Sequence, residues 1–406
     1  MEMSDRAQIT DNAPSLPRGS HSTAKGLILV LAQALPIMAV VSLFPVIPKL
    51  AAQFGSVPNA AFLVPMIITL PSFGVALLSP AAGWLADRFG RRPVFMASLI
   101  IYVLAGLAPL VLDQLKWVVG SRAVLGIAEA GIVTVASTLI ADYFGGDRHR
   151  WLAIQSGLGS LLGTVLIAVG GWLAEYSWRG PFTVYATAVP LLAFAFFYID
   201  EPERVTRSDV EAVRAAFPWR VALVVGFVSL VASVLYYVEP TQIATLFTER
   251  GLQSSARIGQ IQALTSIAYI VGAYVFKRVS NRAIGVQLMI AGGFIGIGLI
   301  GIGLSHTVQQ AALWAVPQQL GAGMVIPALT GWAQGSVSTG LRGRAMGIWA
   351  TFFFAGLFLC PNVVTVTTNA VGGLSETFWI LGVVTCVLAV VSMAAVARSR
   401  QFAAST

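Results

Sequence analysis

Residues 83–95 read Gly83-Trp84-Leu85-Ala86-Asp87-Arg88-Phe89-Gly90-Arg91-Arg92-Pro93-Val94-Phe95. This short polar stretch lies between two long apolar segments, 60–82 and 93–112. Gly90 permits a tight turn, because a residue without a Cβ atom tolerates positive φ. Gly83 leaves room for a neighbouring helix, as small residues do where membrane helices pack together. The sequence therefore predicts a tight, charged loop between two membrane-spanning helices.

Apolar segments of similar length recur along the whole chain. A spanning helix needs about 20 mainly apolar residues. Twelve segments meet that length: 27–50, 60–82, 93–112, 116–141, 152–174, 181–199, 219–246, 257–276, 285–305, 309–335, 345–368 and 375–397. Only 10% of the 406 residues are charged and 57% are hydrophobic, whereas soluble domains carry about 25% charged residues. The predicted fold is all-α, a polytopic membrane protein with twelve transmembrane helices.

A mixed-charge connection at 200–218 divides these segments into two sets of six. We expect a six-helix bundle from 26–199, a cytoplasmic linker at 200–218 and a second six-helix bundle from 219–398. Residues 1–25 lack the apolar region of a cleavable signal peptide and are predicted to be a disordered cytoplasmic tail. Residues 399–406 are predicted to be a second cytoplasmic tail.

The two halves also match one another weakly. The stretch Gly83–Arg92 follows the second segment, and Gly272–Arg282 follows the eighth. The region around Pro45 in the first segment resembles the region around Pro240 in the seventh. Parallel halves with a binding site between them near the membrane midplane are a recognised plan for transporters. The pattern therefore indicates a pseudo-repeat of six helices.

Basic residues gather in alternate connections. Of the 25 lysines and arginines, 19 lie in the tails and in loops on the side of residues 83–92, five lie in loops on the other side, and Arg122 lies inside a segment. Cytoplasmic loops carry the excess of Lys and Arg, so both termini are predicted to be cytoplasmic, in the cell inner membrane. Because the net charge of +8 resides in short loops, it does not indicate nucleic-acid binding.

The sequence offers no pattern for metal or catalytic chemistry. Cys360 and Cys386 lie inside apolar segments, and His21, His149 and His306 are far apart. No metal-ligand spacing or nucleophile motif occurs in the sequence. We therefore expect no metal, no cofactor and no enzymatic activity.

Residues 83–95 closely resemble the loop signature of the major facilitator superfamily, G-x-L-a-D-r-x-G-r-[KR]-x-x, between the second and third spans where that family has it. The span count, the repeat and the linker extend the resemblance over the whole chain, which looks most like the twelve-span drug and sugar efflux branch. The resemblance implies secondary transport of a small molecule by alternating access in a lipid bilayer, powered by a proton gradient. We expect the protein to act as a monomer.

The resemblance also implies a conformational latch at this loop. In the family, the loop aspartate braces the start of span eleven, and the basic residues pair with acids near span four. On this chain the latch would comprise Gly83, Asp87, Arg88, Gly90, Arg91 and Arg92, with Asp142 as the acidic partner. The alternative is that the three arginines only set the topology. We favour the latch, because Asp87 adds nothing to the topology rule.

Three charged residues fall inside predicted spans, where charges are costly and mark functional sites. Arg122 opens the stretch Arg122–Ala130, which resembles the span-four pattern R-x-x-x-G-x-x-x-[GA], whose arginine is linked to proton transfer in proton-coupled members. Glu129 follows about 10 Å further along the same helix face, near the midplane. We favour a proton-coupling role for Arg122 and Glu129. The alternative is a static pair that holds this helix in register.

The third charge, Glu239, precedes Pro240 and follows Tyr236 and Tyr237. Proline frees a backbone carbonyl, and interrupted helices mark binding sites in transporters. The sequence equally allows an interfacial glutamate beside two belt tyrosines. Further candidates for the substrate site are Gln33, Gln155, Gln318, Gln319 and Asn362. Each of these could instead form a hydrogen bond between helices.

The direction of transport stays open at this point. Many antiporters of the family carry G-x-x-x-G-P-x-x-G-G in span five, but this chain has Gly170-Gly171 without the Gly-Pro, since Leu166 and Ile167 stand there. We favour proton-coupled export of small amphipathic organic molecules. The alternative is proton-coupled uptake of an organic solute or anion.

Overall fold

The computed structural model describes residues 21–145, 148–202, 217–338 and 341–404. The prediction of a disordered tail concerns mostly residues 1–20, and the predicted linker lies mostly at 203–216. Both stretches are outside the described residues, as are the last two residues of the predicted tail at 399–406.

Regular structure in the described ranges is entirely helical. The first half contains α1 (His21–Val41), η1 (Phe44–Val46), α2 (Ile47–Phe54), α3 (Ala60–Phe89), α4 (Arg91–Leu107), η2 (Ala108–Leu110), α5 (Leu115–Phe144), α6 (Arg148–Tyr176), η4 (Gly180–Thr187) and α7 (Ala188–Tyr198). The second half contains α8 (Trp219–Glu249), α9 (Ser255–Val279), α10 (Ile284–Leu304), α11 (Val308–Gly335), α12 (Arg342–Val371) and α13 (Leu374–Ala404).

Eleven spans among the described residues are long and apolar enough to cross a membrane. The 28-residue α11 is long enough but more polar, because it contains Gln309, Gln310, Gln318 and Gln319. It packs against α8, α9, α10 and α12 inside the second half. With α11 as the twelfth span, the all-α fold of twelve transmembrane helices predicted from the sequence is confirmed.

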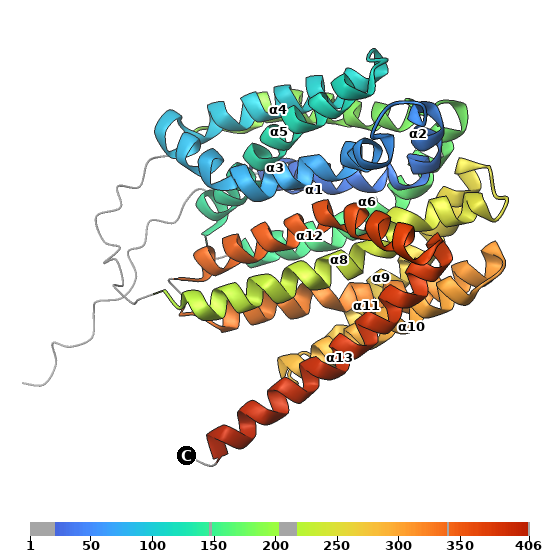
Figure 1. Cartoon of the computed structure of the whole chain (residues 1–406). Helices are drawn as coiled ribbons and strands as arrows, with labels where there is room; N and C mark the ends of the chain where they lie inside the picture. The colour runs from blue at the N-terminus through green and yellow to red at the C-terminus, as the bar shows by residue number, and fades with distance from the viewer. Residues whose placement is uncertain (1–20, 146–147, 203–216, 339–340, 405–406) are drawn as a thin grey trace, which may run out of the picture.

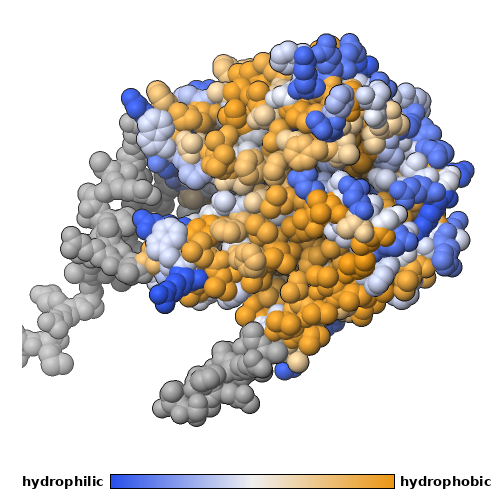
Figure 2. Space-filling model, viewed as in Figure 1, coloured by the Kyte–Doolittle hydropathy of each residue, from blue (hydrophilic) through white to orange (hydrophobic). Residues whose placement is uncertain are grey.

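The two sets of six helices form two layers in Figure 1, the first half in blue to green above the second half in yellow to red. Each half has its own apolar core, in which Phe95 and Phe182 are fully buried in the first and Phe247 and Phe378 in the second. The loops gather at the two ends of the bundle. Figure 2 shows an apolar band between hydrophilic ends, as a protein in a bilayer requires.

The two ends of the bundle differ in their number of lysines and arginines. We name the end at Gly90 the basic end, because it carries Arg88, Arg91, Arg92, Lys277, Arg278, Arg282, Arg342 and Arg344. At the other end, which we name the opposite end, lie Lys49, Lys116, Arg179, Arg250 and Arg257.

The most extensive contacts between the halves are those of α3 with α12 and of α6 with α9. In the first pair, the Thr351 hydroxyl donates to the Ala76 carbonyl over 3.1 Å. That carbonyl is free because Pro80, four residues on, has no N–H. In the second pair, a Cβ built on Gly171 would lie 2.8 Å from the Cα of Gly259. The halves therefore touch closely where neither backbone carries a side chain.

The two proline regions that resemble one another in the sequence differ in structure. Around Pro45, the helix breaks into α1, η1 and α2. Around Pro240, α8 stays continuous. The Tyr236 carbonyl that Pro240 frees accepts a hydrogen bond from Gln318 Nε2 over 3.2 Å, so the missing helical bond is replaced and the helix does not need to break.

Close helix packing beside the signature loop occurs at a different glycine from the one expected. A Cβ on Gly83 would lie 3.7 Å from Thr134, which is ordinary contact. A Cβ on Gly74 of α3 would instead lie 2.7 Å from the Cα of Gly126 in α5. The expectation for Gly83 is therefore wrong, and the tight crossing is that of Gly74 and Gly126.

Candidate functional site

Arg122 is fully buried in the first half, although it is charged. Its Nη2 donates to the carbonyls of Ala105, a short contact, and Gly106, at 3.2 Å. The Ala105 carbonyl has no helical partner because Pro109 lacks an N–H. The guanidinium carbon also lies 5.3 Å from the ring centre of Phe182 and 5.1 Å from that of Tyr185. Carbonyl dipoles and aromatic faces thus surround the cation.

Glu129 lies at the middle of α5, about 21 Å from either end of the helix. The residue is 1% exposed, and its Oε1 has no hydrogen-bond partner among the residues that the structure describes. Among the described residues, no ion pair joins it to Arg122, whose hydrogen bonds go to α4 and Ser121 instead. The alternative of a static pair is therefore wrong for this conformation.

Glu239 is also 1% exposed and lies inside the second half. Its Oε2 accepts a hydrogen bond from Gln319 Nε2 of α11 over 2.6 Å. The neighbouring Gln318 donates to the Tyr236 carbonyl, four residues before Pro240. The side chains of two adjacent glutamines of α11 thus hydrogen-bond to α8 next to its proline. Because Glu239 is buried inside the second half, the alternative of a glutamate at the membrane surface is wrong.

Aromatic rings surround this part of α8. The Tyr236 ring centre lies 4.5 Å from that of Tyr237, 6.4 Å from that of Tyr269 and 5.9 Å from that of Phe353. Trp349 stacks on Phe353 at 5.2 Å. The structure therefore brings together five of the candidate substrate residues, namely Tyr236, Tyr237, Glu239, Gln318 and Gln319.

Tyr269 was missing from the predicted site. Tyr269 lies in α9 and carries no signal of its own, because tyrosines are common in membrane helices.

The other three predicted substrate residues lie outside this group. Gln33 of α1 is buried and accepts a hydrogen bond from Ser137 of α5 over 3.3 Å, while its Nε2 has no partner. Gln155 in α6 and Asn362 in α12 are half-buried. Neither forms a side-chain hydrogen bond within the described part of the chain.

The signature loop contains the predicted ion pair between Arg91 and Asp142. Gly90 adopts φ of 100°, a conformation that glycine tolerates, which confirms the expected turn. Arg88 lies over the rings of Trp84 and Phe89, and Arg92 donates to the Phe196 carbonyl over 2.8 Å. The loop is thus bound to α5 through Arg91 and to α7 through Arg92.

Asp87 differs from the expectation. It is exposed and makes no hydrogen bond or ion pair within the described residues, including the start of α12. Beside this loop, the carboxylate of Glu201 lies at the start of α4, where it accepts from the backbone N–H of Arg91 over 2.7 Å and of Arg92 over 2.8 Å. The start of α4 has free N–H groups that favour an anion. This role of Glu201 was not predicted from the sequence, because Glu201 lies 110 residues from Arg91 along the chain.

The comparisons with known proteins agree with this architecture. The sequence pattern of the Major Facilitator Superfamily matches residues 29–247 and 221–404. The match covers most of the chain, so this chain belongs to the Major Facilitator Superfamily. Its members and the relatives of this chain are transporters, not enzymes.

Two relatives illustrate the branch. The bacillibactin exporter of Bacillus subtilis (strain 168) is 24% identical over 385 residues, which cover 86% of this chain and 90% of that protein. The class B tetracycline resistance protein of Escherichia coli is 25% identical over 301 residues, which cover 72% of this chain and 65% of that protein. The expected resemblance to the efflux type is thereby confirmed.

A solved structure supports the fold. The bacterial homolog of the human lysosomal transporter Spinster, in its inward-facing and occupied conformation, matches with a TM-score of 0.74 and 18% identity. The match covers 94% of this chain and 98% of that chain.

Proposed function

We propose that this protein exports small amphipathic organic molecules across the cytoplasmic membrane in exchange for protons, as a monomer with both termini in the cytoplasm. The proton gradient supplies the energy, and Glu129 carries the exchanged proton. The basic end is then the cytoplasmic end, as its excess of arginine and lysine favours.

The buried carboxyl of Glu129 is the single observation that carries this proposal. It lies at the middle of a spanning helix, without an ion pair and with one oxygen lacking a partner. An unpaired carboxylate costs several kcal/mol in such surroundings. A proton on Glu129 removes that cost while the carboxyl is shielded from water. When the helices around Glu129 open, water compensates for the charge of the ionised carboxylate. The carboxyl therefore suits uptake of a proton on one side and its release on the other.

The position of Arg122 supports the coupling. Its guanidinium lies two helical turns from Glu129 and is held by carbonyls, so its charge favours the ionised carboxyl without trapping it in an ion pair. The same contacts argue against uptake of an anion at Arg122, because the arginine is fully buried and already holds α4.

The relatives support export over uptake. One is named as an exporter of bacillibactin, and another as a tetracycline resistance protein. Both names specify an organic molecule. We extend the direction of transport and this class of cargo to the present chain.

The test uses inverted membrane vesicles that contain a pH-sensitive dye. A respiratory substrate first acidifies the lumen, and then tetracycline, lipophilic cations, organic acids and neutral amphiphiles are added one by one. Wild type is compared with Glu129→Gln and with the control Glu376→Gln, whose carboxyl is exposed at the start of α13. We expect proton release from the lumen on addition of a cargo, unchanged in the control and lost in Glu129→Gln.

Two results would overturn parts of the proposal. Undiminished proton release with folded Glu129→Gln would remove Glu129 as the proton carrier. If no compound releases protons, but right-side-out vesicles accumulate one of them with protons, the direction of transport is uptake.

A further inference from the structure

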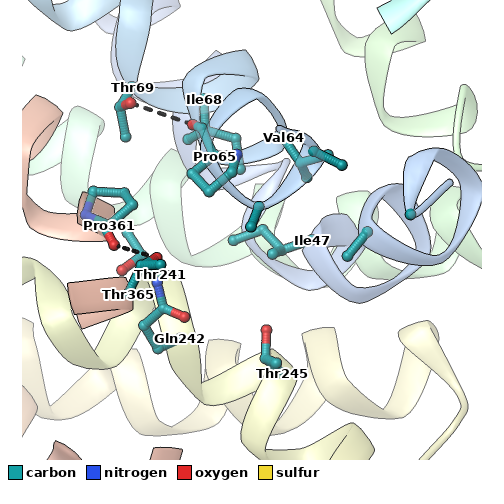
Figure 3. A pocket seen from close by; sticks show the side chains of 14 residues that line it. Ile47, Val64, Pro65, Ile68, Thr69, Thr241, Gln242, Thr245, Pro361 and Thr365 are labelled. Carbon is teal, nitrogen blue, oxygen red and sulfur yellow. Dashed lines mark hydrogen bonds between the residues drawn. The ribbon is translucent and has the colours of Figure 1, made fainter. Parts of the chain in front are cut away.

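A cavity of about 340 Å³ lies between the two halves toward the opposite end of the bundle. Figure 3 shows its two walls facing one another. The first half contributes residues of α2 and α3, among them Ile47, Val64 and Ile68. The second half contributes residues of α8 and α12. Neither Glu129 nor Glu239 lines this cavity, so it is distinct from the buried carboxyls described above.

The two walls differ in chemistry. The wall from the first half is apolar apart from Thr69. The wall from the second half carries four polar side chains, those of Thr241, Gln242, Thr245 and Thr365. No ionisable residue lies among the fourteen that line the cavity. A molecule that fits between these walls has an apolar face and an uncharged polar face.

The hydroxyls in the cavity offer acceptors more than donors. Thr241 donates its hydrogen to the Tyr237 carbonyl over 2.7 Å, Thr365 to the Pro361 carbonyl over 2.9 Å and Thr69 to the Pro65 carbonyl over 3.2 Å. Each hydroxyl oxygen keeps lone pairs for a donor from a ligand. Within the described residues, the amide of Gln242 forms no hydrogen bond, so it can both donate and accept.

We propose that this cavity is a binding site for the exported molecule on the outer side of the membrane, specific for neutral amphiphiles that carry hydroxyl or amide groups. The volume lies within the range of small-molecule sites, about 300 to 1,000 Å³. Because the walls belong to different halves, relative motion of the halves opens and closes the site. A cation gains no partner here, because no carboxylate lines the walls.

This inference rests on the proposed export function but is tested without a proton gradient. In a variant with Cys360→Ala and Cys386→Ala, Thr245→Cys places one thiol in the polar wall. The control is Thr248→Cys, one turn further along α8 and outside the cavity. The rate of modification by N-ethylmaleimide is measured in membranes, alone and with neutral or cationic amphiphiles. Chloramphenicol and a series of neutral glycosides serve as the neutral probes, and tetraphenylphosphonium as the cation.

We expect the neutral probes to slow modification of Thr245→Cys about tenfold or more at saturation, with no effect of tetraphenylphosphonium and no effect on Thr248→Cys. Adding Gln242→Leu should raise the concentration for half-protection about tenfold, the effect of one lost hydrogen bond. If Thr245→Cys fails to fold, Ala51→Cys on the facing wall replaces it.

Absence of protection by every neutral probe at both cysteine positions overturns the site. Equal protection by tetraphenylphosphonium overturns its preference for uncharged molecules. Protection that persists together with Glu129→Gln, in a protein that shows no proton exchange, separates this binding site from a failure of the proposed coupling.

Discussion

Arg91 in the signature loop forms an ion pair with Asp142 at the end of α5. The same loop residue donates its backbone N–H to Glu201, at the end of the first half. One residue therefore connects the loop, the helix that carries Arg122 and Glu129, and the start of the segment that leads to the second half. This arrangement joins the loop to the end of the helix that carries the two buried charges.

Breaking this ion pair should slow the transport cycle rather than weaken binding. We expect Asp142→Asn to lower the turnover rate several-fold while the KM for cargo stays constant. The protein should remain folded, because partly exposed ion pairs contribute only about 0–1 kcal/mol to stability. The exchange Arg91→Asp with Asp142→Arg should restore turnover. A raised KM with normal turnover in Asp142→Asn would show that the pair acts on binding.

Glu129→Gln should separate proton coupling from the movement of cargo. Glutamine has the shape of a protonated glutamate but cannot release a proton. We expect net proton-driven export to fall to the level of vesicles without the protein. Exchange of labelled for unlabelled cargo across the membrane should persist, because it needs no proton transfer. Loss of both activities in a folded protein would show that Glu129 binds cargo instead.

Arg122 should also be needed for the stability of the first half. Removal of its guanidinium leaves the Ala105 carbonyl without a donor, at a cost of about 1–3 kcal/mol for a buried polar group. We expect Arg122→Ala to lower the melting temperature in detergent by several degrees. Arg122→Lys should recover only part of it, because an ammonium lacks the planar face that lies against Phe182 and Tyr185. An unchanged melting temperature in Arg122→Ala would contradict the contacts with α4.

The helix crossing at Gly126 should not tolerate a side chain. A Cβ there would lie 2.9 Å from the Pro71 carbonyl oxygen and 3.1 Å from the Gly74 Cα, and backbone atoms cannot move aside easily. We expect Gly126→Ala to lower the accumulation of folded protein strongly. Gly83→Ala is the matched control and should fold normally, because its Cβ has ordinary space. Fluorescence size-exclusion profiles of both variants measure the difference.

We expect the hydrogen bond from Gln319 to the buried carboxyl of Glu239 to stabilise the fold. Gln319→Leu leaves the buried carboxyl without this donor, so we expect a loss of about 1–3 kcal/mol in stability. Gln318→Leu is the comparison, since it removes the donor to the Tyr236 carbonyl next to the same proline. A double variant, Glu239→Leu with Gln319→Leu, should be more stable than Gln319→Leu alone, because no unpaired polar group remains. Equal stability of these two variants would contradict a direct role of the hydrogen bond.

The sequence by itself determined the spans, the repeat and the family. A membrane span is mainly apolar because lipid contacts it along its length. The ends of a span can therefore be located where charged residues begin. The predicted segment 309–335 thus corresponds to α11 at Val308–Gly335, and 60–82 to most of α3 at Ala60–Phe89. The turn at Gly90 could also be predicted, because glycine tolerates positive φ. The partnership of Arg91 with Asp142 was implied by the resemblance of the loop to the family signature.

Only the tertiary structure decided which polar groups meet. Gln319 and Glu239 are 80 residues apart, and Glu201 and Arg91 are 110 apart. Their contacts depend on the rotation and crossing of whole helices, which apolar composition leaves undetermined because most faces of these helices are similarly apolar. For the same reason the sequence did not show that Glu201 meets the start of α4 or that Asp87 makes no contact with the start of α12 among the described residues. Nor did it show the uncharged cavity between Ile47 and Thr245, because each of its lining residues is also common in ordinary membrane packing.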